Sequence, residues 1–302
     1  MNNKKLSLNF LAFFTIVVWG TTFVSTKVLL SNFTPAEIMF LRFLIAYIML
    51  LLIHPKFHKI TSIKEESLFL LAGITGGSLY FITENSALIY SLTSNVALIL
   101  ATAPILTAFM AHFFSKGENL NKNLFIGFII AILGVFLVIF NGNFILKLNP
   151  IGDILALSAA LCWAVYSVTL KKISGKYNYI YITRKIFFYA LLTILPFILF
   201  SSSSNINTMS LSQPKIIFNL LFLGVIASGI CYVVWNYTVD NLGIIKTNNY
   251  IYLIPAVTMI ASFFILNESI TIYSTFGAIL VLLGVYVSEN GFKLLKFKQR
   301  LH

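Results

Sequence analysis

A carboxylate and an amide stand inside one long apolar stretch of the chain, LYFITENSALIY at residues 79–90. They are Glu84 and Asn85. A second charged side chain, Arg42, lies inside the preceding apolar stretch, and Lys27 lies near the end of the first one. Ionisable residues in such stretches face the protein interior or water, because an unpaired charge in lipid is costly. Glu84 is therefore a candidate to bind an amino group or to carry a proton.

Aromatic and amide side chains provide the other candidates. Trp19 and Trp163 stand near the middle of two apolar stretches, although tryptophan prefers the membrane interface. Their rings suit stacking on a substrate or a cation–π contact with an ammonium group, and the alternative is that they fill core space. Further polar residues that could line a cavity are Tyr80, Asn85, Asn95, Tyr166, Ser167, Asn236, Asn249 and Tyr250. Asn85 and Asn236 suit an interhelical hydrogen bond equally well.

The composition decides which elements hold these residues. The chain has 302 residues, of which 59% are hydrophobic and 10% charged, and its mean hydropathy is +0.91. Soluble domains carry about 25% charged residues. Ten apolar stretches, each close to the ~20 residues that cross a bilayer as a helix, cover 8–30, 36–53, 67–90, 94–115, 122–140, 151–170, 180–201, 214–236, 247–266 and 272–289. They predict an all-α polytopic membrane protein with ten transmembrane helices.

The basic residues are distributed unevenly between the loops. With the N-terminus inside, 17 of the 21 Lys and Arg residues fall in cytoplasmic segments and only Lys147 and Lys215 in outer loops. This bias predicts that both termini are cytoplasmic, and it explains the net charge of +12 without a nucleic acid partner. The first stretch is too long for a signal peptide and is expected to be a retained span. The expected location is the cytoplasmic (inner) membrane of a bacterium.

An internal repeat divides the chain into two halves of five helices, 1–145 and 146–302, within one integrated transmembrane domain. Matched residues recur at nearly constant offsets: Gly73, Asn85 and Pro104 match Gly224, Asn236 and Pro255 at 151, Glu118, Gly127 and Gly134 match Glu268, Gly277 and Gly284 at 150, Trp19 and Lys27 match Trp163 and Lys171 at 144, and Arg42 matches Arg184 at 142. An odd number of helices inverts the second half, which predicts a substrate site near the midplane between the halves. Pro104 and Pro255 are the expected helix breaks.

Several of these motifs resemble one known family. WGTTFVSTK (19–27), PAEIMFLRF (35–43) and the twin spacing of glutamate and two glycines after Glu118 and Glu268 resemble the EamA family of the drug/metabolite transporter superfamily. The resemblance implies secondary transport of small organic molecules, often export of amino acids or related metabolites, by alternating access. The second half departs from the pattern, since WAVYSVTLKK lacks the glycine after the tryptophan and YITRKI lacks the opening proline.

The predicted substrate site comprises Trp19, Tyr80, Glu84, Asn85, Trp163, Tyr166, Asn236 and Tyr250. At a helical rise of about 1.5 Å per residue, Glu84 and Arg42 reach similar depths and Lys27 a slightly shallower one. A gating ion pair of Glu84 with Arg42 or Lys27 is therefore an alternative to substrate binding. The position that matches Glu84 in the second half is Trp235, so the carboxylate is not duplicated.

The function favoured by these features is a secondary transporter, with export as the expected direction, of small organic metabolites such as amino acids. The alternative is efflux of drugs or lipophilic cations with Glu84 as counter-ion, and proton coupling remains open for both. A membrane-embedded enzyme fits less well, because with two aspartates and four histidines the chain shows no catalytic constellation at membrane depth. A passive channel would be expected to show a ring of repeated polar residues and oligomeric symmetry. No P-loop, HExxH, GxSxG or dinucleotide-binding turn is present. No cofactor, metal or nucleic acid is expected. The expected partners are a small-molecule substrate and the lipid bilayer, and the sequence does not set the oligomeric state.

Overall fold

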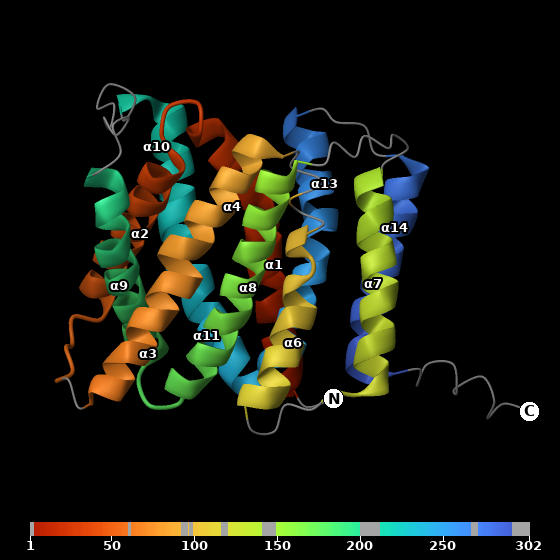
Figure 1. Ribbon diagram of the computed structural model, residues 1–302, viewed down its shortest axis with the longest axis horizontal. Helices are drawn as coiled ribbons and strands as arrows, with labels where there is room; N and C mark the ends of the chain where they lie inside the picture. The colour runs from red at the N-terminus through yellow and green to blue at the C-terminus, as the bar shows by residue number, and fades with distance from the viewer. Residues whose placement is uncertain are drawn as a thin grey trace, which may run out of the picture.

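The computed structural model describes residues 3–59, 62–91, 96, 99–115, 120–140, 149–199, 212–266 and 271–291. Their regular elements are all helical and run side by side along one axis (Figure 1). In chain order they are α1 (Asn3–Leu29), α2 (Pro35–Ile53), α3 (Ile63–Gly73), η1 (Ile74–Ser78), α4 (Leu79–Tyr90), α6 (Ala103–Phe114), α7 (Lys122–Phe140), α8 (Pro150–Ile173), α9 (Tyr179–Leu199), α10 (Pro214–Leu221), η3 (Phe222–Ile230), α11 (Cys231–Leu242), α12 (Ile244–Asn249), η4 (Tyr250–Leu253), α13 (Ile254–Leu266) and α14 (Ile272–Asn290).

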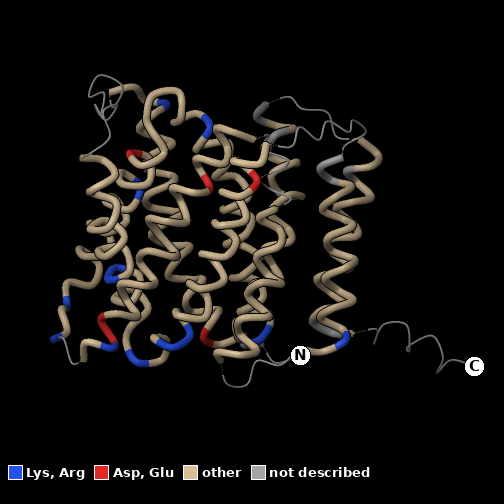
Figure 2. The backbone as a smooth tube through the Cα atoms, in the orientation of Figure 1, with Lys and Arg blue, Asp and Glu red and all other residues tan. Residues whose placement is uncertain are grey.

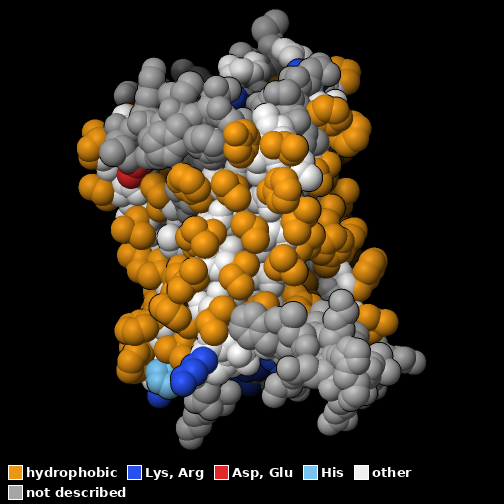
Figure 3. All heavy atoms as spheres, turned by 90° about the vertical axis from the view of Figure 1, so that its right-hand side faces the viewer, with side chains coloured by type: hydrophobic (Ala, Val, Ile, Leu, Met, Phe, Trp, Pro, Cys, Tyr) orange, Lys and Arg blue, Asp and Glu red, His pale blue; other side chains and the backbone are white. Residues whose placement is uncertain are grey.

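Six of the described helical segments are long and apolar enough to cross a membrane, and shorter apolar helices occupy the remaining predicted spans. Large hydrophobic side chains are exposed along the outer helices, for example Phe125 and Leu133 of α7. Figure 3 shows one face of the molecule whose middle is covered by such side chains. Burial in a bilayer accounts for this surface, because soluble monomers rarely expose large apolar areas. The prediction of an all-α polytopic membrane protein is confirmed.

Two of the spans contain a π-helical segment at matched positions. In the third span η1 joins α3 to α4, and in the eighth η3 joins α10 to α11. Residues 74–78 shifted by the repeat offset of 151 fall within η3. Both segments are rich in small residues, and the ring of Tyr166 packs where a Cβ on Gly76 would stand. A π-helical turn changes the face that the following helix presents, and α4 and α11 both turn side chains toward the centre of the bundle.

The helices α7 and α14 form a close antiparallel pair, which Figure 1 shows at one side of the bundle. A Cβ built on Gly127 would lie 2.6 Å from the carbonyl oxygen of Gly284, and one on Gly134 would lie 2.6 Å from that of Gly277. Small residues allow this approach of two backbones. These are the matched glycines of the two halves, and their antiparallel contact is the one expected if the halves are inverted.

The two ends of the bundle differ in charge (Figure 2). Most Lys and Arg residues gather at the end where α1 begins and α8 ends, which is called the basic end here. At the other end, called the opposite end, α1 ends at Leu29, and a capping box of Thr34 and Glu37 starts α2. Basic residues gathered at one end are what the positive-inside rule leads us to expect for the cytoplasmic end. The orientation in the membrane stays a prediction.

Candidate functional site

A cavity lies between the helices and is partly open to the outside of the bundle. Its lining residues are Trp19, Thr22, Phe23, Thr26, Arg42, Tyr80, Phe81, Glu84, Asn85, Leu88, Leu100, Ala101, Ala103, Trp163, Tyr232, Ile251, Ile254 and Pro255. Thr26 and Leu88 lie within one turn of the ends of α1 and α4. The cavity therefore extends from the middle of the bundle toward the opposite end.

Aromatic rings form the part of the cavity at the middle of the bundle. The ring of Trp19 lies 5.4 Å from those of Trp163 and Tyr232, and the ring of Tyr80 lies 5.4 Å from Trp163. Hydrogen bonds hold both indoles, because Trp19 Nε1 donates to the carbonyl oxygen of Ala227 at 2.9 Å and Trp163 Nε1 to Asn248 Oδ1 at 2.8 Å. The rings are fixed and offer faces and edges to a ligand.

Glu84 is buried in α4, with 7% of its surface exposed, and lines the cavity. The Tyr80 hydroxyl, one turn earlier, donates to Glu84 Oε1 at 3.3 Å, and this is the sole hydrogen bond of the Glu84 carboxylate within the described residues. Its neighbour Asn85 also lines the cavity and donates to the carbonyl oxygen of Pro35 at 3.5 Å. A carboxylate accepts several hydrogen bonds, so Glu84 retains capacity to bind a donor in the cavity.

Arg42 of α2 presents its guanidinium to the same cavity. Its Nε donates to Ser228 Oγ of η3 at 2.9 Å, and its guanidinium carbon lies 4.5 Å from the ring centroid of Phe81. In the part of the chain that the structure describes, the two terminal nitrogens of Arg42 make no hydrogen bond or ion pair. Ser228 and Phe81 orient the group, and its two free nitrogens match a bidentate carboxylate.

The predicted ion pair between these residues is not formed. Arg42 and Glu84 interact electrostatically, but none of the ion pairs among the described residues joins them. Lys27 is exposed and does not line the cavity. The pair is absent from this conformation for a geometric reason, and a gating role of these residues stays a prediction. Ser228 and Phe81 hold Arg42, and Lys27 follows Thr26 by one residue, which rotates it about 100° from the cavity face of α1.

Three predicted substrate contacts lie outside the cavity lining. Tyr166 is fully buried one turn beyond Trp163, and its hydroxyl donates to Asn236 Oδ1 at 2.9 Å. Asn236 Nδ2 in turn donates to Thr183 Oγ1 at 2.8 Å. This is the interhelical hydrogen bond that was the alternative for Asn236. Tyr250 is buried in η4, and its neighbour Ile251 lines the cavity instead.

The two matched prolines stand at the start of helices rather than inside them. Pro104 occupies the first turn of α6, and Pro255 is the second residue of α13, directly after the 3₁₀ turn η4. Proline suits this position because its missing N–H has no helical partner there. Pro255 and Ala103 line the cavity, so both breaks border it. Asn95, Glu118 and Glu268 lie outside the described residues.

Several residues of the site were not identified from the sequence. Thr22 and Thr26 follow Trp19 at helical spacing on α1, and this spacing was the signal that could have found them. Tyr232 is the residue that offset 151 matches to Phe81, and both line the cavity. Ser228 and Asn248 act behind the lining, as acceptors for Arg42 and Trp163. No local pattern marks such acceptors, because their partners are about 186 and 85 residues away.

Comparisons with known proteins give one consistent result. The model of the EamA-like transporter family matches residues 6–140 and again 150–289. An uncharacterized transporter of Archaeoglobus fulgidus is 28% identical over 95% of this chain and 98% of its own length. A probable amino-acid metabolite efflux pump of Escherichia coli is 27% identical over 94% of this chain and 95% of its own length. A crystal structure that is 18% identical shares the fold, with a TM-score of 0.74 over 97% of this chain and 98% of that chain.

The family match covers both halves of the chain, and these two relatives match it over nearly its full length. Together with the apolar helices, it makes this chain a multi-pass membrane protein of a transporter family. The chain belongs to the EamA-like transporter family.

Proposed function

We propose that this protein is a secondary transporter that exports a small zwitterionic metabolite, such as an amino acid, across the cytoplasmic membrane. The observation that carries the proposal is the pair of opposite charges in one cavity. Glu84 and Arg42 both face it, from α4 and α2, and do not pair with each other. Buried charges without a partner are costly, and a ligand with one ammonium and one carboxylate group would satisfy both.

The roles of the two charges follow from their chemistry. The carboxylate of Glu84, beside the Tyr80 hydroxyl, would accept hydrogen bonds from the substrate ammonium group. The terminal nitrogens of Arg42 would bind the substrate carboxylate in a bidentate way. Both side chains are held by neighbours, Glu84 by Tyr80 and Arg42 by Ser228, so little conformational entropy would be lost on binding.

The rings of Trp19, Trp163 and Tyr232 support an apolar or aromatic substrate side chain. They lie at the middle of the bundle, below the charges, and their indole N–H groups are already bonded to the protein. What these rings present to a ligand is therefore mainly apolar surface. The name of the relative from Escherichia coli, a probable amino-acid metabolite efflux pump, agrees with this substrate class.

A lipophilic cation fits the same cavity less well. It would use Glu84 as its counter-ion, but it would also bring a positive charge close to Arg42 in a buried site, where like charges repel strongly. The zwitterion satisfies both groups, and the cation only one.

The test is transport by the purified protein in proteoliposomes, with a panel of labelled amino acids that includes aromatic ones, with and without a pH gradient. We expect saturable flux for at least one member. Glu84→Gln should reduce it about tenfold or more, since hydrogen bonds to a charged group contribute about 1.5–3 kcal/mol. Asp153→Asn is the matched control, because Asp153 bonds to Ser91 at the opposite end, outside the cavity lining.

The gradient separates two roles of Glu84. If Glu84→Gln loses only the flux that depends on the gradient, Glu84 carries the proton. If it loses flux under both conditions, Glu84 binds the substrate. Normal flux in this variant would remove Glu84 from the site, and a panel in which no amino acid moves would contradict the zwitterion and favour the lipophilic cation.

A further inference from the structure

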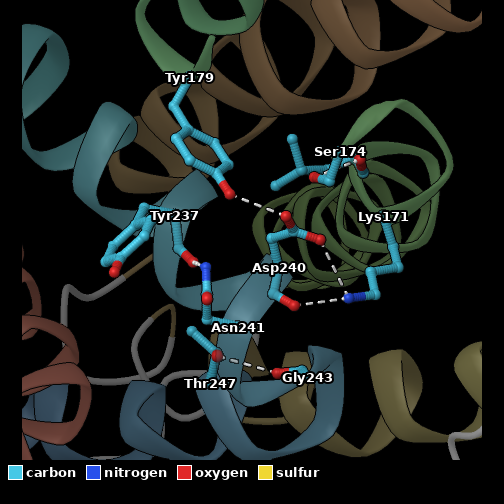
Figure 4. Close-up of polar contacts among 9 residues, drawn as sticks. Lys171, Ser174, Tyr179, Tyr237, Asp240, Asn241, Gly243 and Thr247 are labelled. Carbon is cyan, nitrogen blue, oxygen red and sulfur yellow. Dashed lines mark hydrogen bonds and ion pairs between the residues drawn. The ribbon is translucent and has the colours of Figure 1, made fainter. Parts of the chain in front are cut away.

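A polar cluster closes the bundle at its basic end, across from the cavity. Lys171 Nζ of α8 lies 3.2 Å from Asp240 Oδ1 of α11 and donates to the backbone oxygen of Asp240 at 2.8 Å. The hydroxyl of Tyr179, at the start of α9, donates to Asp240 Oδ2 at 2.8 Å. Figure 4 shows the Asp240 carboxylate between its two partners. One aspartate thus ties three helices together, and these three residues are called the Asp240 cluster.

The three helices of the cluster match those that carry the polar wall of the cavity. By the repeat offsets of 144, 142 and 151, α8, α9 and α11 correspond to α1, α2 and α4. In the first half these helices stand around the cavity with Thr22, Arg42 and Glu84. In the second half the corresponding junction is bridged by the Asp240 cluster.

Four of the residues that match the cavity wall are fully buried in the second half, whereas Trp163 and Tyr232, which match Trp19 and Phe81, line the cavity themselves. The matched pairs, cavity residue first, are Thr22 and Tyr166, Glu84 and Trp235, Asn85 and Asn236, and Leu88 and Val239. The second member of each pair has 0% of its surface exposed. At these four positions, equivalent residues line a cavity in the first half and are packed in the second.

One detail shows that this packing is not fully satisfied, and a second shows that the matched lysines differ between the two ends. Trp235 Nε1 is buried without a hydrogen-bond partner among the described residues, and a buried donor without an acceptor is rare because it loses its hydration without compensation. Lys27, the counterpart of Lys171, is exposed and takes part in no ion pair within the described part of the chain. The matched lysine is thus paired at the packed end and unpaired at the end with the cavity.

We propose that the Asp240 cluster is a latch over a second set of substrate contacts, formed by Tyr166, Trp235 and Asn236. When Asp240 releases Lys171 and Tyr179, α8, α9 and α11 separate, and these three side chains become the wall of a cavity that faces the basic end. This wall offers an indole N–H, an amide and a phenol, but no counterpart of the Glu84 carboxylate. A zwitterion at this wall lacks an ammonium partner, so it binds more weakly from the basic end than in the cavity with Glu84. The inference rests on the proposed function, since it requires a carrier that opens to each end in turn.

Thiol accessibility in lipid nanodiscs tests the latch without any substrate. Leu88 and Val239 are a matched pair, and each is replaced by cysteine in a separate variant. Modification by N-ethylmaleimide is measured at each cysteine by mass spectrometry. Because this readout distinguishes the sites, the native Cys162 and Cys231 need not be removed. In the parent protein Leu88→Cys should react quickly and Val239→Cys slowly. Adding Asp240→Asn should speed the reaction at position 239 about tenfold, the effect of losing one charge-assisted contact, while position 88 reacts no faster.

The controls separate a latch from a loosened fold. Lys171→Gln removes the other partner of the Lys171–Asp240 ion pair and should speed the reaction at position 239 in the same way. It therefore tests the latch even if Asp240→Asn does not fold. Lys172→Gln changes the next residue of α8, which is exposed and outside the cluster, and should leave both rates unchanged. Unchanged reactivity at position 239, or faster reactivity at both positions, would overturn the latch. Because no substrate is present, this outcome is independent of the amino-acid transport test.

Discussion

The two halves of the bundle use matched residues in opposite ways. Arg42 of α2 faces the cavity, and its terminal nitrogens have no partner among the described residues. Its counterpart Arg184 of α9 donates to the backbone oxygens of His54 and Lys56 and lies over the ring of Phe57. The same residue type at the same repeat position is thus part of a candidate binding site in one half and of a sealed end in the other. The role of a residue is therefore decided by the contacts that it makes in this conformation, and not by its position in the repeat.

The largest effects are expected from substitutions of these two arginines, one on transport and the other on stability. Arg42→Gln should lower kcat/KM for a zwitterionic substrate about 10–100-fold, because it removes charge-assisted hydrogen bonds, without lowering thermal stability. Arg184→Gln should destabilise the fold by about 2 kcal/mol, because it leaves two loop carbonyls without their donor. Transport assays and thermal unfolding of both variants in the same detergent measure this. Equal stability losses in both variants would contradict the contrast.

The α7–α14 pair belongs to neither cavity wall and should affect stability alone. A Cβ on Gly127 would stand 2.6 Å from the backbone of α14, which cannot move aside as a side chain would. Gly127→Ala should therefore cost about 1–3 kcal/mol, while the folded fraction keeps its transport rate. Ile129→Ala, on the exposed side of α7, is the control and should change the melting temperature little. A lower KM or kcat in folded Gly127→Ala would assign this pair a role in transport.

A smaller effect on transport is expected from Ser228, which contacts Arg42 but does not line the cavity. Ser228→Ala removes the acceptor that orients Arg42 Nε, and the loss of one such bond, about 1 kcal/mol, should raise KM about fivefold with kcat nearly constant. Ser158→Ala removes a similar hydroxyl that bonds to its own helix at an exposed site and should leave KM unchanged. If Ser228→Ala behaves like this control, Arg42 is positioned by Phe81 alone.

The smallest effect is expected at Lys27. Because this side chain is exposed and outside the cavity, Lys27→Gln should change KM by less than about twofold, in line with surface charges in general. Initial rates over a range of substrate concentrations would show this. A loss as large as that of Arg42→Gln would restore Lys27 to the site.

The sequence was sufficient to predict the class of fold and part of the site. Apolar stretches of bilayer length predict helices directly, and Glu84, Asn85 and both tryptophans stand out because polar or interfacial residues are unexpected at such depth. Each of these four residues lines the cavity. Depth also indicated that Arg42 and Glu84 could meet, since a helix has a constant rise per residue, and both line the cavity.

Rotation about the helix axis could not be predicted in the same way. The π-helical turns η1 and η3 change which face α4 and α11 present, and periodicity does not reveal such turns. Tyr166 was assigned to the site because it follows Trp163 at helical spacing, and Lys27 because of its depth, but they lie on other levels or other faces of their helices. Which half of an inverted repeat is open is likewise a property of the conformation, so the burial of Asn236 could not be read from its match with Asn85.

One cavity is proposed to bind both charges of a zwitterion. Competition between an amino acid and its truncated analogues measures this. Counterflow of a labelled amino acid in proteoliposomes would be inhibited by the unlabelled amino acid, by the amine that lacks its carboxylate, and by the acid that lacks its amino group. We expect each truncated compound to compete at least about tenfold more weakly than the intact amino acid, since each leaves Arg42 or Glu84 without its partner. An amine that competes as well as the intact amino acid would contradict it and identify a cation site at Glu84.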